Sequence, residues 1–221
     1  MKFKAAIFDF NGTLFWDTSF HDRAFDIMLS KHGVLLTDEE KRVKIHGKTN
    51  PIIMRGIFGD QLTDNVAESL AQEKEAIYRD LCINDLELAP GAEEFFDFLK
   101  NNGIPMTIAT SAGIENVEFY FKNINLEKWF DFEKVVYDNG TFRGKPHPDV
   151  FLIAAEKLGF EALETIIFED SAAGIISAEA ANAGKIYIVN SYGADYKSFS
   201  HDIISNFNQV DKRLFEIKPT Q

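Results

Sequence analysis

Short apolar runs alternate with longer segments of helical spacing along the chain after residue 88. Each run ends near polar or acidic residues, which predicts strands at 106–109, 135–137, 165–168 and 186–189. The segments between them predict helices at 91–102 and 148–158, and a further helix after residue 171. This alternation is typical of βαβ units, so we expect an α/β fold built on a Rossmann-like parallel sheet.

A first strand is expected at residues 4–8, an apolar run that ends just before the turn signal Asn11-Gly12. The next segment differs, because no convincing strand separates its helical patterns at 20–31, 38–44 and 65–81. We therefore predict an α/β core of residues 1–15 and 88–221, and an all-helical insertion of residues 16–87 that caps the strand ends. The tail from residue 190 carries one more helical pattern near 208–215 and is expected to cover a sheet edge.

The overall charge narrows the possible partners. A net charge of −12 with a pI near 4.9 would repel nucleic acid and anionic lipid, so we expect neither as a partner. No apolar run approaches the roughly 18 residues that span a bilayer, and Asp9 interrupts the first run early, so a cytoplasmic location is expected. Cys82 is the only cysteine, which excludes an intramolecular disulfide and predicts a small buried side chain.

Asp9 is the first candidate for chemistry, because it follows the first predicted strand. In open α/β sheets ligands bind at the carboxyl ends of the strands, so this carboxylate is a candidate nucleophile or metal ligand. The alternative is structural: Asn11-Gly12 is an ordinary tight-turn pair, and an aspartate beside it can bond its own backbone.

Polar residues at the same predicted edge extend this site. Thr110 and Ser111 offer hydroxyl and backbone N–H groups that suit a phosphate oxygen, although they could equally cap the next helix. Lys145 lies in a stiff, proline-flanked loop that fixes its direction, although such loop lysines are also common at the surface. Glu169 and Asp170 end a strand and open a helix; a capping role is one alternative, but adjacent carboxylates also suit Mg²⁺.

Four motifs together resemble the haloacid dehalogenase-like superfamily, and the similarity covers essentially the whole chain. It is closest to the β-phosphoglucomutase-like phosphatases and mutases, which carry a helical cap after the first motif. The motifs, in the family's order and spacing, are Asp9-x-Asn11-Gly12-Thr13, Thr110, Gly144-Lys145-Pro146-x-Pro148-Asp149-x-Phe151 and Glu169-Asp170-Ser171-x-x-Gly174.

The resemblance implies that Asp9 attacks phosphorus to form an aspartyl-phosphate. It also implies that Mg²⁺ is held by Asp9, the backbone carbonyl of Asn11 and Asp170, with Glu169 assisting through a water. The acidic pair favours Mg²⁺-dependent phosphoryl transfer, because the dehalogenase branch generally lacks it. Positive charge from the metal and from Lys145 suits a dianionic phosphate that approaches a carboxylate.

By the same resemblance, Thr110 and Lys145 hold the transferring phosphoryl oxygens, with Gly12 and Ser111 among the phosphate-binding residues. The expected substrate is a small phosphorylated metabolite, and the expected state is a monomer or weak homodimer.

In the cap, His21, Arg23, Ala24 and Lys74 resemble positions that contact the closing site, although His21 and Lys74 could instead be solvated side chains. In the segment 46–50, Asn50 stands where the mutase pattern carries a phosphate-binding arginine. This favours a phosphatase over the alternative of a sugar-phosphate mutase. A non-catalytic phosphate-binding protein of the same fold is a further alternative.

Asn11 departs from the family pattern, which has an aspartate there that protonates the leaving alcohol and then activates water. An amide can do neither, and such general acid–base catalysis is worth about 10² to 10⁴ in rate. Three hypotheses follow. The enzyme acts on acyl or aryl phosphates that need no protonation, His21 replaces the missing acid and base, or the asparagine is an engineered substitution that traps substrate.

Overall fold

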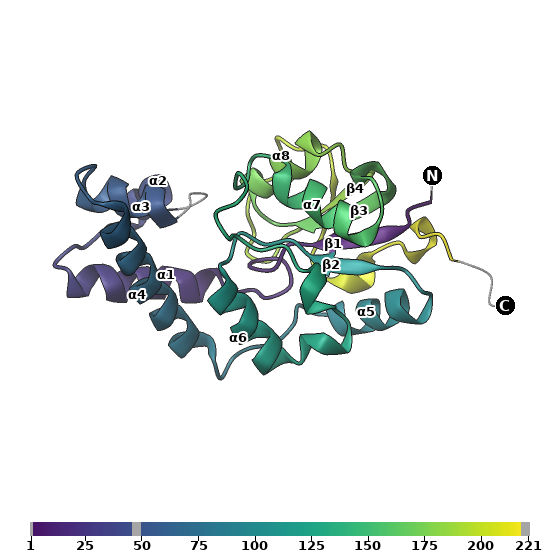
Figure 1. Cartoon of the computed structure of the whole chain (residues 1–221), viewed down its shortest axis with the longest axis horizontal. Coiled ribbons are helices and arrows are strands. Elements are labelled where there is room, and N and C mark those ends of the chain that lie inside the picture. The colour runs from purple at the N-terminus through teal and green to yellow at the C-terminus, as the bar shows by residue number, and fades with distance from the viewer. Residues whose placement is uncertain (1, 46–49, 218–221) are drawn as a thin grey trace. The chain divides into compact units, whose positions relative to one another are not determined.

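Five parallel strands form the central sheet in a computed structural model that describes residues 2–45 and 50–217 (Figure 1). Their order across the sheet is β2-β1-β3-β4-β5, so the N-terminal strand lies inside the sheet. The strands are β1 (Ala5–Phe8), β2 (Met106–Ile108), β3 (Thr165–Glu169), β4 (Lys185–Val189) and β5 (Asp202–Ile204). The predicted α/β fold with a Rossmann-like parallel sheet is confirmed.

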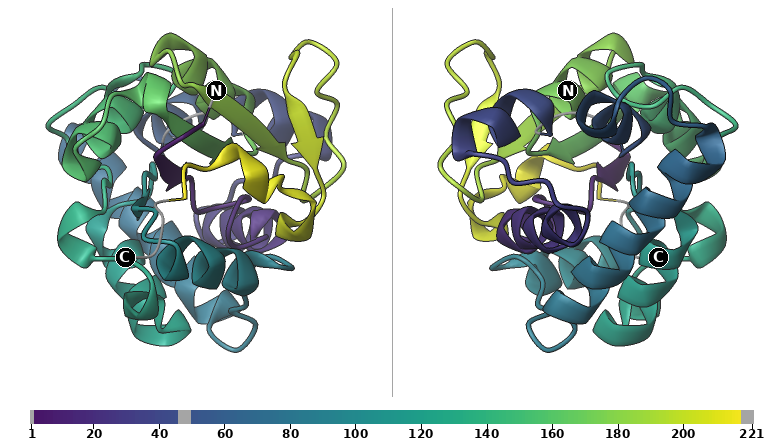
Figure 2. Two further views of the ribbon diagram at one scale, coloured as in Figure 1. Left: turned by 90° about the vertical axis from the view of Figure 1, so that its right-hand side faces the viewer. Right: turned by 90° about the vertical axis from the view of Figure 1, so that its left-hand side faces the viewer.

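Helices cover both faces of this sheet, which explains why its inner strands are apolar at nearly every position (Figure 2). On one face the rings of Phe95 and Phe96 pack against Phe8, and Phe95 also packs against Phe168. On the other face Phe151 belongs to a cluster that contains small alanines and buried isoleucines. The described helices of the α/β part of the chain are α5 (Ala92–Asn101), α6 (Ile114–Ile124), α7 (Asp149–Leu158) and α8 (Ala172–Ala180).

Register places the carboxyl ends of β1 and of its two neighbours, β2 and β3, at one edge. Phe8 of β1 is opposite Ile108 of β2 and Phe168 of β3. The residues that follow these positions therefore emerge side by side, and they carry the predicted chemistry.

The sequence-based prediction was wrong at three places. Residues 135–137 form no strand; Val136 makes only an isolated bridge to Ala109. Residues 208–215 form no α-helix but lie in two 3-10 turns, η4 (Phe207–Gln209) and η5 (Lys212–Leu214), because Asn206 and Asp211 accept hydrogen bonds from nearby backbone N–H groups. The tail does not merely cover the sheet, since it supplies the edge strand β5 itself. The other 3-10 turns are η1 (Leu126–Lys128), η2 (Phe132–Lys134) and η3 (Ala162–Glu164).

A second compact unit, Asp17–Asp85, separates residues 1–16 from 86–221, whereas the predicted boundaries followed residues 15 and 87. Its described elements are α1 (Thr18–Lys31), α2 (Asp38–Lys44), α3 (Asn50–Phe58) and α4 (Asp64–Cys82). It has its own core, in which Met28, Leu29 and Met54 are almost completely buried. The sequence reasoning missed α3. Among the described residues, no helix combines the length and apolar character that crossing a membrane requires.

Candidate active site

Three buried carboxylates meet at the carboxyl edge of the sheet. Asp9 follows β1, and Glu169 and Asp170 stand at the end of the neighbouring strand β3. Each side chain offers an oxygen within 4.8 Å of the others, and none of the three residues is more than 5% exposed. Carboxylates this close and this buried repel one another unless positive charge lies among them.

Lys145 supplies positive charge to this cluster. Its Nζ lies 2.5 Å from Asp9 Oδ1 and 2.6 Å from Glu169 Oε2. Burial disfavours the ammonium, but the charges of Asp9 and Glu169 outweigh it and raise the pKa of Lys145 above its usual value. The side chain is only 7% exposed, so the alternative interpretation of a solvated loop lysine is wrong.

An ion pair closes the loop that carries Lys145. Arg143 donates through Nε and Nη2 to the two carboxylate oxygens of Asp149, at 3.0 and 2.7 Å, and its backbone N–H donates to Oδ2 at 3.1 Å. These hydrogen bonds lower the pKa of Asp149 to about 2. The loop is therefore fixed at both ends, on either side of the lysine.

Glu169 is held by the start of α8. Its Oε1 accepts hydrogen bonds from the backbone N–H of Asp170 and from both the N–H and hydroxyl of Ser171, while Oε2 faces Lys145. Gly174 leaves room for this carboxylate, because a Cβ there would lie 2.0 Å from Glu169 Cδ. Ser171 also caps α8 by accepting from the N–H of Gly174. The side-chain cap of α8 is therefore Ser171, and not the acidic pair Glu169–Asp170 for which a capping role was the alternative.

The Asp170 carboxylate points back toward the turn after β1. Its Oδ1 accepts a hydrogen bond from the Thr13 hydroxyl at 3.0 Å. A Cβ on Gly12 would lie 2.2 Å from its Oδ2, and Gly12 has a φ of +79°, so glycine is required there for both reasons. Burial, followed by the charges of Glu169 and Asp9, raises the pKa of Asp170 well above its usual range.

Asn11 lies in the same turn after β1, and its carboxamide forms a hydrogen bond with an aromatic residue of α6. Nδ2 donates to the hydroxyl of Tyr120 at 2.8 Å, and Thr110 Oγ1 lies 3.5 Å from Asn11 Oδ1. The Tyr120 ring stacks on Phe10 with their centroids 4.1 Å apart. The sequence reasoning missed Tyr120, because at helical spacing it looks like an ordinary core aromatic and only its hydroxyl distinguishes it.

Thr110 and Ser111 follow β2 at the same edge, but neither caps α6. The helix begins after Gly113, which makes no side-chain capping bond, and the Thr110 hydroxyl accepts from the N–H of Ala112 at 3.1 Å. Thr110 is buried and Ser111 is exposed. The helix-cap interpretation of this motif is therefore wrong.

Comparison with known proteins identifies the family. Residues 3–182 match the family model of haloacid dehalogenase-like hydrolases. The chain belongs to this family. It is therefore an enzyme of the hydrolase class, as the four motifs led us to expect.

Individual relatives extend this hydrolase assignment. A phosphorylated carbohydrates phosphatase from Thermotoga maritima is 27% identical over 188 residues, which cover 83% of this chain and 84% of that protein. The crystal structure of a HAD hydrolase of family IA, variant 3, from Entamoeba histolytica is 34% identical, with a TM-score of 0.89 and 97% of each chain covered. The β-phosphoglucomutase of Clostridium difficile shares the fold at 22% identity, with a TM-score of 0.78 over 96% of this chain and 94% of its own.

The helical unit of the hydrolase holds the other predicted site residues, His21 and Lys74. Lys74 Nζ lies 2.6 Å from His21 Nδ1 and 2.9 Å from Glu75 Oε1, and His21 Nε2 lies 3.4 Å from Asp17 Oδ2. His21 also stacks on Tyr78 with centroids 4.0 Å apart. Lys74 is only 2% exposed, so the interpretation of a solvated charge is wrong.

Asn50 also bonds within the helical unit. Its Nδ2 donates to Glu75 Oε1 at 3.0 Å. Residues 46–49, the rest of the segment compared with the mutase pattern, lie outside the described residues. Arg23 is exposed and Ala24 is buried in the same unit.

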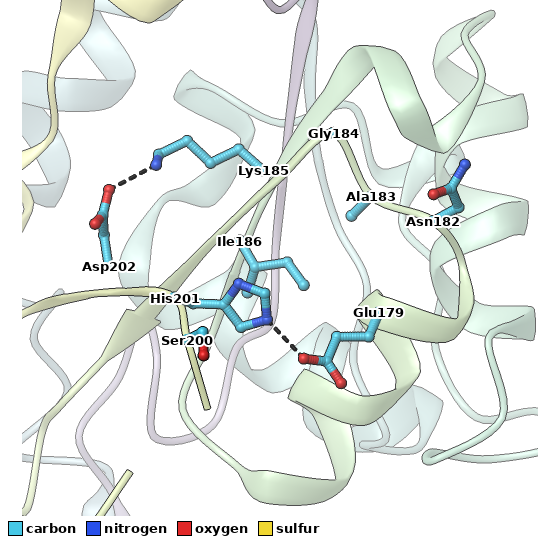
Figure 3. A pocket seen from close by; sticks show the side chains of 9 residues that line it. All are labelled: Glu179, Asn182, Ala183, Gly184, Lys185, Ile186, Ser200, His201 and Asp202. Atoms are coloured by element: carbon cyan, nitrogen blue, oxygen red, sulfur yellow. Dashed lines mark hydrogen bonds and ion pairs between the residues drawn. The ribbon is translucent and has the colours of Figure 1, made fainter. Parts of the chain in front are cut away.

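A separate cavity of about 360 Å³ lies at the opposite end of the hydrolase's sheet, where β4 and β5 begin (Figure 3). Its charged side chains pair with one another, Lys185 with Asp202 at 2.6 Å and His201 with Glu179 at 2.8 Å. None of the predicted site residues lines this cavity.

Proposed function

We propose that this hydrolase removes phosphate from small phosphorylated metabolites, with carbohydrate phosphates as the first class to test. The observation that carries the proposal is the buried cluster in which Lys145 contacts both Asp9 and Glu169 while Asp170 lies within reach of both acids. The named phosphatase relative supports the substrate class. A carboxylate nucleophile, an adjacent cation and an acidic pair are what phosphoryl transfer to a carboxylate requires.

The donor set fits Mg²⁺. Carboxylate oxygens of Asp9 and Asp170, with the backbone carbonyl of Asn11, would form an all-oxygen set of the kind that hard divalent cations prefer. Three clustered carboxylates outnumber the single ammonium of Lys145, and burial, followed by the charges of Glu169 and Asp9, raises the pKa of Asp170. When bound, the cation would neutralise phosphoryl charge and orient the substrate for in-line attack.

Asp9 would act as the nucleophile. One of its carboxylate oxygens forms a bond to phosphorus while the bond from phosphorus to the leaving oxygen breaks. Lys145 and Thr110 would hold the phosphoryl oxygens during this transfer. Water then attacks the phosphorus of the aspartyl-phosphate, the bond to Asp9 breaks, and dihydrogen phosphate leaves with both protons of the water while the carboxylate is restored.

Asn11 would limit which leaving groups depart quickly. An alcohol needs a proton as it leaves, and a carboxamide neither supplies one at neutral pH nor accepts one from water. We therefore propose that acyl and aryl phosphates turn over faster than alkyl phosphates. His21 has less support as a substitute acid and base, because Lys74 engages its Nδ1 and Asp17 lies near its Nε2.

A phosphate-release assay tests this function. The wild-type protein is offered a panel of sugar, acyl and aryl phosphates with Mg²⁺ and with EDTA, beside Asp9→Asn and the exposed control Asp195→Asn. We expect Mg²⁺-dependent release that falls to assay background in Asp9→Asn and is unchanged in Asp195→Asn. Equal release from Asp9→Asn and wild type would exclude Asp9 as the nucleophile. Inactivity of the wild type on the whole panel, with Mg²⁺ still bound, would favour the non-catalytic alternative.

A further inference from the structure

Tyr196 lies in the connection between β4 and β5, outside all four motifs, and its hydroxyl bonds to the backbone of Asp170. The hydroxyl donates to the Asp170 carbonyl oxygen at 2.7 Å. The residue is 4% exposed and its ring packs in a small cluster with Ile175 of α8 and Ile188 of β4. Two elements, α8 and β4, therefore hold the tyrosine, which in turn fixes one atom of the turn between β3 and α8.

Each polar group of Asp170 is fixed from a different direction. Its N–H donates to Glu169, its carboxylate accepts from Thr13, and its carbonyl accepts from Tyr196. A buried carbonyl in a turn needs such a partner, because the sheet ladder does not reach it. Without the tyrosine hydroxyl, the peptide plane after Asp170 would keep only the hydrogen bond from the Ser171 N–H to Glu169, and the carbonyl would lose its partner.

Tyr192 is an exposed residue in the same connection between β4 and β5. It is 53% exposed and lies close to Tyr196. A tyrosine hydroxyl has one proton, and Tyr196 gives its proton to the Asp170 carbonyl. Tyr192 thus offers a comparison residue with the same hydroxyl chemistry, because it lies near Tyr196 but is not the donor to the Asp170 carbonyl.

We propose that Tyr196 is a positioning residue for the cation site, which it maintains by holding the Asp170 carbonyl. The inference rests on the proposed function, because that function makes Asp170 a cation ligand. Residues that support metal ligands typically contribute about 10- to 100-fold in metal affinity. Tyr196 acts through the backbone rather than on the ligating oxygen, so the lower end of that range, about tenfold, is expected.

Direct titration of Mg²⁺, followed by calorimetry and by thermal unfolding, tests the proposal without an activity assay. Tyr196→Phe keeps the ring and removes only the hydroxyl, and we expect its Kd for Mg²⁺ to rise about tenfold. Tyr192→Phe should bind Mg²⁺ within about twofold of the wild type, because the bond to Asp170 remains. In Tyr196→Phe at saturating Mg²⁺, the KM for the organic phosphate should be unchanged.

A packing control separates positioning from general stability. Phe199→Leu perturbs the same cluster but leaves the tyrosine hydroxyl in place. If Phe199→Leu weakens Mg²⁺ binding as much as Tyr196→Phe at an equal loss of metal-free Tm, the hydroxyl has no specific role and the proposal is overturned. It is also overturned if Tyr196→Phe binds Mg²⁺ as the wild type does.

The same titration distinguishes this inference from the proposed function. If the wild type and Asp170→Asn both fail to bind Mg²⁺, the cation site itself is wrong, and the positioning role fails with it. If the wild type binds Mg²⁺, Asp170→Asn does not, and Tyr196→Phe is unaffected, only the inference about Tyr196 fails.

Discussion

Asn11 carries the largest consequence of any single residue. Its amide donates to Tyr120, and an aspartate there would instead accept the tyrosine's proton in a hydrogen bond of similar geometry. The surroundings are therefore compatible with the acid–base group that the family pattern has at this position.

We predict that Asn11→Asp raises kcat for alkyl phosphates by about 10²- to 10⁴-fold, the usual contribution of general acid–base catalysis. Acetyl phosphate should gain much less, because its leaving group needs no proton. Turnover of both substrates is compared in the wild type and the variant, with Tyr120→Phe as a control for the local hydrogen bond. An acetyl-to-alkyl ratio that is equal in the wild type and in Asn11→Asp would refute the leaving-group hypothesis.

Protonation of the Asp170 carboxyl makes the stability of the protein depend on pH. Burial and the charges of Glu169 and Asp9 raise its pKa above the value of 3.8 expected for the unfolded chain. The folded metal-free protein therefore holds the proton of the Asp170 carboxyl more tightly than the unfolded chain does. The resulting stabilisation is complete below pH 3.8 and is lost as pH rises through the folded pKa.

Because Mg²⁺ must displace that proton, binding should tighten as pH rises through the same range. We expect the increase in Tm caused by a fixed Mg²⁺ concentration to be larger at high pH than at low pH, and to vanish in Asp170→Asn. Calorimetric scans over a pH series measure this. An increase in Tm that is constant across the series would contradict the assignment of Asp170 as a cation ligand.

At the scale of elements, the turn after β1 is built around a glycine that cannot be replaced cheaply. We predict that Gly12→Ala abolishes Mg²⁺ binding, because its Cβ would meet Asp170 Oδ2 at 2.2 Å. Gly140→Ala is the matched control, since Gly140 also has a positive φ, +72°, but nothing lies within 4 Å of an added Cβ. Both variants should lose about 1 to 3 kcal/mol of stability from backbone strain. Mg²⁺ binding is measured by calorimetry. Retained binding in Gly12→Ala would show that the Asp170 carboxylate does not need the space beside Gly12.

The inner elements could be predicted from sequence because burial on both faces makes β1, β3 and β4 nearly continuous apolar runs. Residues 135–137 have the same composition, and pattern alone could not reveal that only Val136 would pair. The edge strand β5 gave no signal, because two of its three residues are exposed.

The residues of the candidate site likewise fall into those that the sequence could predict and those that it could not. Asp9, Lys145, Glu169 and Asp170 could be predicted because each stands in a motif with fixed spacing, and the structure brings them together. Tyr120 and Tyr196 could not, since each contributes one hydroxyl from a segment whose apolar pattern only indicates packing.

At the scale of the whole molecule, the two units have separate hydrophobic cores. We predict that Leu29→Ala, at a position 1% exposed, lowers the free energy of unfolding of the helical unit by about 2 to 5 kcal/mol. The affinity of the α/β unit for Mg²⁺ should stay unchanged. Hydrogen exchange followed by mass spectrometry shows which unit is destabilised, and calorimetry measures the Mg²⁺ affinity. Faster exchange in residues 86–217 as well as in 17–85 would contradict the prediction that the two units unfold separately.

The placement of β1 inside the sheet also governs when the enzyme becomes active during its synthesis. Asp9 and Lys145 are 136 positions apart, and Thr13 and Asp170 are 157 apart. Because β1 pairs with β2 and β3, it cannot complete its pairing until the ribosome has made both neighbours, whereas residues 17–85 can form their helices from local contacts. A nascent chain that ends before β3 would therefore lack both a fully paired β1 and Asp170, and it would be hydrolytically inactive.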